Sequence, residues 1–396
     1  MRTAQLGFFL ALGLTPAFAA ASPGPIGPDI PVASTSAECP AVAMSANGDF
    51  EVVWSLPFSE SHPSPQGIFA RHFDREGTPT QPAAVRLDVP SPKEATFARV
   101  IPLPDGGYFA VWWEDFSRRR TETATVGRIL DPTGRPRGPV LLLVPNRTLV
   151  ALTVVNDDLL VAWKDTANGV LRARRFDFAG LPVRFVMHLT NHATLGTVDV
   201  APLADSFVAV WERWTGSSWV VEAQRFSLVG KARGAALRMN ENPPGGQFRV
   251  KVASDGSERF AVAWTKRRLR SDPQTGQQFF DDKPRVQFFD AGGSIGPPAR
   301  PNQFSTGDQP ATGLAMDHRG VALVTWYTDR NSHTSDLDVL GRFVDPSGRP
   351  VGEEFSLSEN LAGNDFCPVA ATDDDGAWVV AWLKQSTGVY ARRLTF

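Results

Sequence analysis

The chain has 396 residues, with 40 Lys and Arg against 42 Asp and Glu, which gives a formal net charge of −2. A nearly neutral chain offers no electrostatic footprint for a nucleic-acid partner. The 34 glycines and 32 prolines are abundant, and they favour an all-β fold of short strands joined by tight turns.

Residues 1–20 have the features of a secretory signal peptide. Arg2 gives a positive start, residues 6–14 form an apolar core, and Ala17–Ala19 is a small-x-small cleavage site, with Ala21 as a second place for cleavage. The apolar core is too short to cross a bilayer, and no later segment approaches the run of about 20 apolar residues that a membrane helix needs. We therefore expect a secreted or periplasmic protein without a membrane span.

A strand of the type apolar-x-apolar-x-Trp recurs along the rest of the chain, at the spacing of roughly 50 to 60 residues that is typical of propeller blades. Each unit also has an inner strand of small residues, a third strand and an outer strand. We therefore predict a seven-bladed β-propeller over residues 21–396, with blades that begin near residues 40, 97, 148, 196, 248, 310 and 368. The Trp strands end at Trp54, Trp112, Trp163, Trp211, Trp264, Trp326 and Trp382.

The third strand of most units ends in Arg or Gln, followed by Asp three residues later and Gly three further on, as in Arg71, Asp74 and Gly77. Asp can accept hydrogen bonds from the turn backbone, and Gly permits positive φ. The Arg or Gln is present in every blade, and an active site is rarely copied so often. We interpret it as structural.

The seventh unit stops at Phe396, before its glycine and outer strand. The missing pattern occurs at the other end, because Gly24–Pro28 resembles Gly293–Pro297 and residues 30–33 have strand character. We therefore predict that residues 21–35 supply the outer strand of the last blade. That pairing closes the ring and removes an open sheet edge.

The two cysteines, Cys39 and Cys367, precede the inner strands of the first and seventh blades at equivalent positions. Those blades are neighbours only if the ring closes. A disulfide between them suits an exported protein. In the chain-entropy model it stabilises the fold by roughly 4 to 5 kcal/mol. The alternative is a pair of buried thiols whose Cα atoms lie too far apart to be bridged.

The repeat unit reads Gly48-Asp49-Phe50-Glu51-Val52-Val53-Trp54, followed by Ala70-Arg71-His72-Phe73-Asp74. It resembles a repeat of large secreted and surface proteins of bacteria, of the type G-D-F-x-V-x-W … A-[RQ]-R-F-D-x-x-G. The resemblance covers nearly the whole mature chain. It implies a β-propeller and no particular activity.

In a propeller, the loops between second and third strands share a face with the connections between blades. These loops vary greatly in length here, over residues 55–66, 114–123, 265–284 and 327–337, whereas the turns of the opposite face are short. Variable loops on a rigid scaffold commonly carry function. We therefore predict a binding face there, for a protein or a carbohydrate ligand.

Three aromatic residues at or near the exits of Trp strands, Trp113, Trp214 and Tyr327, are candidate platforms for a sugar or a peptide. The alternative is packing beneath the long loops, because large aromatic side chains are mostly buried. Two basic runs, Lys266–Arg270 and Arg118–Arg120, either solvate their loops or meet an anionic polysaccharide or lipid headgroup.

The loop after Tyr327 contains Asp329, Arg330, His333 and Asp336. Its carboxylates suit a cation, Ca²⁺ being the one cofactor that they suggest, or an acid–base pair. The alternative is a solvated loop, because the spacing matches no known ligand motif.

Three acids from adjacent blades, Glu38, Asp308 and Asp365, are expected at the mouth of the central channel. There they either form a metal site or hydrolytic pair or simply face water. The chain contains no HExxH, GxSxG, P-loop or dinucleotide fingerprint. The leading hypothesis is therefore a monomeric, non-catalytic binding protein. The second is a carbohydrate-active hydrolase or lyase that uses these acids.

Overall fold

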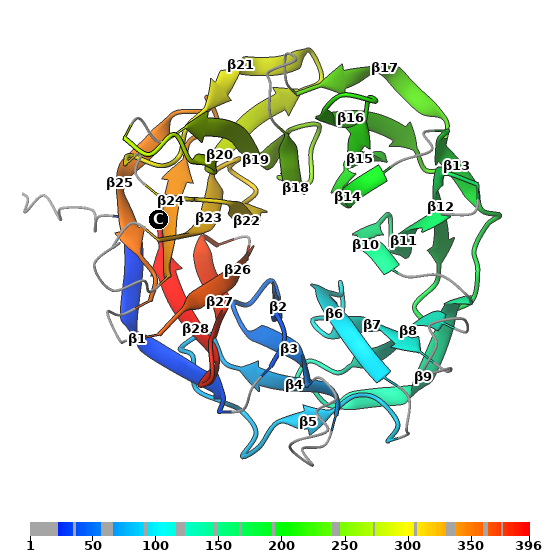
Figure 1. The fold of residues 1–396 in the computed structure, drawn as a ribbon. Helices are drawn as coiled ribbons and strands as arrows, with labels where there is room; N and C mark the ends of the chain where they lie inside the picture. The colour runs from blue at the N-terminus through cyan, green and yellow to red at the C-terminus, as the bar shows by residue number, and fades with distance from the viewer. Residues whose placement is uncertain are drawn as a thin grey trace, which may run out of the picture.

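The computed structural model describes residues 23–34, 37–56, 66–90, 94–115, 123–145, 149–165, 168–191, 195–239, 246–271, 274–304, 307–329, 337–358, 363–373 and 375–396. Over these residues the protein is all-β, with seven four-stranded antiparallel sheets arranged as blades in a ring (Figure 1). The predicted seven-bladed β-propeller is confirmed. Among the same residues, no helix has the length and apolar character needed to cross a membrane.

Within a blade the strands run in the order inner, second, third and outer. Blades 1 to 3 contain β2 (Ala41–Met44), β3 (Phe50–Leu56), β4 (Gly67–Phe73) and β5 (Val85–Arg86); β6 (Glu94–Pro102), β7 (Tyr108–Asp115), β8 (Thr123–Leu130) and β9 (Pro136–Pro145); and β10 (Leu149–Val155), β11 (Asp158–Asp165), β12 (Val170–Phe176) and β13 (Met187–Thr190).

The next three blades follow the same order. They contain β14 (Leu195–Leu203), β15 (Ser206–Trp214), β16 (Trp219–Ser227) and β17 (Ala232–Arg238); β18 (Gln247–Ser254), β19 (Phe260–Ser271), β20 (Gln278–Asp290) and β21 (Gly293–Ala299); and β22 (Ala311–Met316), β23 (Ala322–Thr328), β24 (Asp338–Val344) and β25 (Pro350–Ser356). Blade 7 contains β26 (Asp365–Thr372), β27 (Ala377–Lys384), β28 (Gly388–Thr395) and β1 (Gly24–Ala33).

The N-terminal strand completes the last blade, as predicted. β1 pairs antiparallel with β28, from Gly24 opposite Thr395 to Ala33 opposite Val389, and the two lie side by side in Figure 1. The Arg392 Nη2 atom of β28 donates a hydrogen bond to the Gly27 carbonyl of β1 at 3.0 Å. This pairing satisfies the backbone groups that an unpaired edge would expose.

The Arg or Gln at the end of the third strand makes the same contact in other blades. Arg128 Nε donates to the Gly138 carbonyl at 3.1 Å, and Gln287 Nε2 donates to the Gly296 carbonyl at 3.1 Å. The acceptor lies in each case on the outer strand of the same blade, so the side chain joins the third strand to the outer one. These bonds agree with the structural interpretation of the repeated Arg or Gln.

The Asp and Gly of the motif build the following turn. Asp74 Oδ1 accepts hydrogen bonds from the backbone N–H groups of Glu76 and Thr78, at 3.0 and 2.7 Å. Gly77 has φ of +85°, in the left-handed region that favours glycine. This is the turn chemistry predicted from the motif.

The core lies between the blades. Each of the described core clusters joins two neighbouring blades, as when Val210 of blade 4 packs with Trp264 of blade 5. One cluster joins blade 7 to blade 1 through Ala381 and Trp54. The Trp strands are therefore apolar on both faces because both faces are covered. The result is a rigid ring that holds its connecting loops in place.

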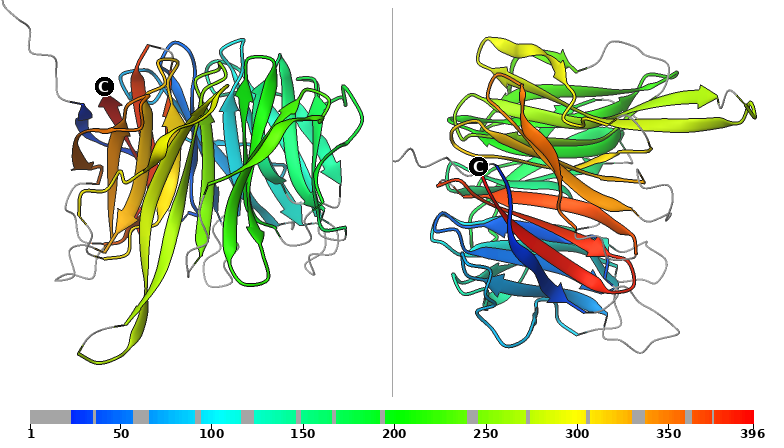
Figure 2. Two further views of the ribbon diagram at one scale, coloured as in Figure 1. Left: turned by 90° about the horizontal axis from the view of Figure 1, so that it is seen from above. Right: turned by 90° about the vertical axis from the view of Figure 1, so that its left-hand side faces the viewer.

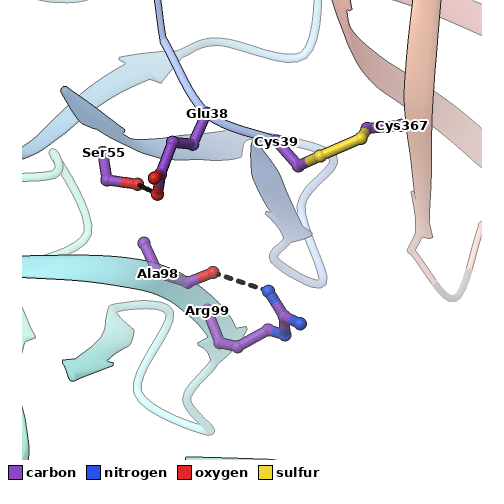
Figure 3. The surroundings of a disulfide bond; sticks show 6 residues. All are labelled: Glu38, Cys39, Ser55, Ala98, Arg99 and Cys367. Carbon is purple, nitrogen blue, oxygen red and sulfur yellow. Dashed lines mark hydrogen bonds between the residues drawn. A yellow bond between two sulfur atoms is a disulfide. The ribbon is translucent and has the colours of Figure 1, made fainter. Parts of the chain in front are cut away.

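A disulfide joins the first and last blades. Cys39 and Cys367 are 328 residues apart in sequence, and their Cα atoms are 5.5 Å apart (Figure 3). The predicted disulfide is confirmed, and the alternative of two free thiols is excluded.

The connection predicted for residues 265–284 is not a loop. β19 extends to Ser271 and β20 begins at Gln278, so the blade 5 ladder continues as a hairpin that projects well beyond the ring (Figure 2). We call this extension, residues 265–284, the blade 5 hairpin. It rises from the face that carries the second-to-third-strand connections, which we call the loop face.

Candidate functional site

A row of aromatic side chains crosses the loop face from blade 4 to blade 5. Trp214 ends β15 and Trp219 begins β16, so the two stand opposite each other at the end of a ladder, with ring centroids 5.6 Å apart. Phe248, near the start of β18, lies 6.5 Å from Trp219. Trp214 is 40% exposed, while Trp219 and Phe248 are half-buried.

Arg267 of the blade 5 hairpin continues the row. Its guanidinium lies over the ring of Phe248, 4.7 Å from the centroid, and over the ring of Phe280, 4.6 Å from the centroid. Such a sandwich combines cation–π attraction with a polar edge. We call Trp214, Trp219, Phe248, Arg267 and Phe280 the aromatic row.

Asp282 fixes the orientation of Arg267. Arg267 Nε donates to Asp282 Oδ1 at 2.7 Å, and Nη2 donates to Oδ2 at 2.6 Å. These hydrogen bonds raise the pKa of Arg267 above its ordinary value. The bidentate geometry holds the guanidinium in one plane between the two rings, with only its edge left to bond a ligand.

Tyr327 adds a second aromatic–arginine contact in blade 6. The Arg249 guanidinium lies 5.6 Å from the centroid of the half-buried Tyr327 ring. Arg249 has φ of +57° and sits in a β-bulge between Phe248 and Lys251. Bulges redirect side chains near functional surfaces, and this one places Arg249 against the next blade.

A group of carboxylates lies beside the aromatic row. Asp308 Oδ1 accepts a hydrogen bond from the backbone N–H of Asp282 at 3.0 Å, and the backbone N–H of Asp308 donates to Asp329 Oδ1 at 2.7 Å. Partial burial, followed by the charges of Asp282 and Asp329, raises the pKa of Asp308. Asp308 is thus a carboxyl group disposed to carry a proton at a higher pH than usual.

The other two predicted channel-mouth acids are held within their own surroundings. Glu38 Oε2 accepts a hydrogen bond from Ser55 Oγ at 2.6 Å (Figure 3). It accepts a second one from Thr96 Oγ1. Asp365 is only 1% exposed and its Oδ2 lies 3.5 Å from Lys384 Nζ. Burial raises the pKa of Asp365 to about 6 against the opposing effect of Lys384. Over the part of the chain that is described, no group of three or more His, Cys, Asp or Glu residues is placed to hold a metal ion.

The three aromatic residues predicted as exposed platforms differ in their actual exposure. Trp214 is exposed and Tyr327 is half-buried, whereas Trp113 is only 5% exposed. Its ring lies 6.3 Å from that of Phe97, which is 63% exposed above it. The suggestion that Trp113 is an exposed platform is therefore wrong, and the alternative of packing applies.

Some candidates cannot be placed. Arg330, His333 and Asp336 lie outside the described residues, as does the run Arg118–Arg120. Of the polar group after Tyr327, Asp329 alone belongs to the candidate site. The signal peptide, residues 1–20, also lies outside the described range.

Sequence reasoning missed three members of the aromatic row, Trp219, Phe248 and Phe280. A signal for Trp219 was present, because four residues separate it from Trp214 and a short hairpin turn places the two opposite each other. Phe280 lies within a stretch that has the composition of a loop. Its place depends on the strand pairing of the blade 5 hairpin.

Comparison with known proteins adds fold information alone. No protein family model matches the chain, and none of the curated proteins matches it. Among solved structures, hydrazine synthase of Kuenenia stuttgartiensis is similar with a TM-score of 0.53 and 11% identity, over 90% of this chain and 98% of that chain. An α-L-arabinanase of Penicillium chrysogenum, complexed with arabinobiose, has a TM-score of 0.52 and 10% identity, over 95% and 99%. A polysaccharide lyase described as an ulvan lyase has a TM-score of 0.54 and 9% identity, over 91% and 94%.

Proposed function

We propose that the protein is an exported binding protein whose loop face holds an extended carbohydrate chain over blades 4 to 6. The aromatic row carries the proposal. Flat rings with polar edges give sugar rings large contact areas, and neighbouring Arg and Asp groups supply hydrogen bonds to hydroxyls. Trp214 and Trp219 provide the rings, and Arg267 with Asp282 provides the fixed polar pair.

Export is supported by two independent features. A disulfide such as Cys39–Cys367 is typical of proteins in an oxidising environment, as in the periplasm or outside the cell. The repeat that begins at Gly48 resembles one of secreted bacterial proteins, and this agrees with the signal-like residues 1–20.

A glycan and peptide array tests the proposal, with the Trp214→Ala variant as the key comparison. Loss of one stacking ring is expected to weaken carbohydrate binding by about 1 kcal/mol, which is roughly a fivefold rise in Kd. Phe185→Ala is the matched control, because Phe185 is 69% exposed and lies in the β12–β13 connection of the opposite face. Equal binding by all three proteins, or binding confined to peptides, would contradict a carbohydrate site on the aromatic row.

A second candidate function is hydrolysis or lyase cleavage of a carbohydrate at the same face. The observation that favours it is Asp308, whose raised pKa and neighbouring Asp329 suit a general acid or base. Turnover of bound glycans by the wild type, abolished in Asp308→Asn with the fold intact, would support this function. Glu38→Gln and Asp365→Asn then test whether the other channel-mouth acids take part. Binding without any turnover would leave the binding protein as the function.

A further inference from the structure

The blade 5 hairpin has a second, strongly basic side. Side chains alternate along a strand, so Lys266, Arg268 and Arg270 project from the side opposite Arg267. Lys283 stands directly across the ladder from Lys266, on the same side. With Arg285 and Arg300 these side chains line a pocket of about 60 Å³ at the base of the hairpin.

The pocket has far more positive than negative charge. Asp281 is the one acidic residue among its described lining residues. Its carboxylate already bonds Arg270 and Lys283, each at 2.6 Å. Although burial opposes ionisation, these bonds hold the pKa of Asp281 below its ordinary value. Asp281 therefore forms ion pairs with two of the six Lys and Arg side chains that line the pocket.

Arg285 is the buried centre of the unbalanced charge. It is 7% exposed, and within the described residues its Nη1 donates to the Pro284 carbonyl at 2.6 Å. Burial, and then the charges of Arg300 and Arg268, lower the pKa of Arg285 to about 10. No described carboxylate forms a salt bridge with these three arginines. A buried guanidinium beside two others is unfavourable unless an anion lies among them.

The size and donor geometry of the pocket define the anion. A volume of about 60 Å³ is several times the roughly 10 to 15 Å³ that one water molecule needs, and it suits one small oxyanion. Guanidinium groups present paired N–H donors that match the oxygens of a carboxylate or a sulfate. Arg268 and Arg300 are exposed, so an anion can reach the pocket from solvent.

We propose that this pocket binds one carboxylate or sulfate group of an acidic polysaccharide whose sugar rings contact the aromatic row. The anion site follows from the pocket itself, whereas the polysaccharide rests on the proposed function. The two surfaces are the two sides of one hairpin. Phe279 and Phe280, 48% and 51% exposed, stand on opposite sides near its tip, so a chain that crosses the hairpin meets both.

The test compares two double variants with the wild type. Arg268→Gln with Arg300→Gln removes two exposed arginines of the pocket and leaves the buried Arg285 in place. The control, Arg184→Gln with Lys231→Gln, removes the same charge from exposed residues in the turns of the opposite face. Titration calorimetry uses polygalacturonate for the carboxylate, dextran sulfate for the sulfate and neutral dextran as the uncharged polymer. Inorganic sulfate, followed by thermal unfolding, probes the pocket alone.

The wild type is expected to bind one of the acidic polymers, and the pocket variant to bind it about tenfold more weakly or worse, with less than a twofold change in the control. Sulfate is expected to raise the Tm of the wild type and the control by more than that of the pocket variant, because its general stabilising effect is common to all three and only binding adds to it. Which acidic polymer binds identifies the anionic group.

If the pocket variant binds the acidic polymers as tightly as the wild type does, the anion site is overturned while the proposed function stands. If sulfate stabilises through the pocket but no acidic polymer binds, the polysaccharide assignment is wrong while the anion site stands. If neither sulfate nor an acidic polymer acts through the pocket, the anion site and the polysaccharide assignment are both overturned. The proposed function is decided separately, by the glycan array.

Discussion

At the scale of the residue, burial changes the acid–base behaviour of Asp365. Its folded-state pKa of about 6 lies above the ordinary value of a carboxyl group, because the side chain is almost wholly enclosed beside Lys384. The folded state therefore holds a proton that the unfolded state has already released between about pH 4 and pH 6. Stability that is present below pH 4 is lost as the pH rises through 6.

The variant Asp365→Asn is expected to lack this pH-dependent loss, which amounts to about 3 kcal/mol for a pKa displaced by about two units. Lys384 stays charged across the window, and its attraction to the ionised carboxylate is already contained in the pKa of about 6. Urea unfolding at pH 4, 5, 6 and 7 gives the difference between variant and wild type. Asp105→Asn, in an exposed turn, is the control. A wild-type-minus-Asp365→Asn curve that is flat in pH would contradict the assigned protonation.

Whether an aromatic side chain of the loop face is exposed depends on neighbouring residues whose positions cannot be predicted from the sequence. Trp113 and Trp214 both lie at the ends of Trp strands, but Phe97 packs against the first and Trp219 stands beside the second. Phe97 reaches Trp113 from a bulged inner strand, at φ of +56°. Positive φ at a phenylalanine is uncommon and has no sequence signature. Exposure at these positions was therefore beyond prediction.

At the scale of elements, the blade 5 hairpin is the part of the loop face whose form was least predictable. A strand covered on one side shows an apolar alternation, and this hairpin has none because both of its sides meet solvent near the tip. Cross-strand ion pairs such as Arg267–Asp282 and Arg270–Asp281 hold it instead. By contrast, the Trp strands and the turns after Asp74 and its equivalents were predictable, because burial and turn chemistry leave direct marks on composition.

Shortening the blade 5 hairpin is expected to remove binding without loss of the fold. The variant joins Arg268 to Asp281 through an Asn-Gly turn and so deletes residues 269–280. The deleted apolar residues Leu269, Phe279 and Phe280 are about half exposed, so Tm is expected to change by only a few degrees, whereas binding of the array-selected glycan is lost. Circular dichroism and calorimetry measure the two effects. Unchanged glycan affinity in the folded variant would show that the hairpin does not contribute to the site.

At the scale of the whole molecule, two devices join blade 7 to blade 1. β1 completes the sheet of blade 7, and the disulfide links Cys39 before β2 to Cys367 in β26. Both were predictable from sequence. Comparison of the repeats shows that the seventh lacks its outer strand, and the two cysteines occupy equivalent positions in two units. Closure of the ring depends on pairing in the folded state, whereas the disulfide acts chiefly on the unfolded chain.

The double variant Cys39→Ser, Cys367→Ser is expected to keep the closed ring and to unfold at lower denaturant. The loss is about 2 to 5 kcal/mol, because the unfolded chain regains the freedom that a link across 328 residues had removed. Guanidinium titration of the variant, and of the wild type with a reductant, should agree within error. A variant as stable as the oxidised wild type would contradict a stabilising role.

The pairing of β1 with β28 also means that the ring can close only after the last strand has been synthesised. A ribosome releases Gly24–Ala33 before any blade, yet their partner strand is made last, so the earliest segment must wait while hundreds of residues are added. Contacts this distant in sequence form slowly. Until β28 is made, this segment has no partner strand and is exposed to pairing with another chain, which is the main aggregation risk of the fold.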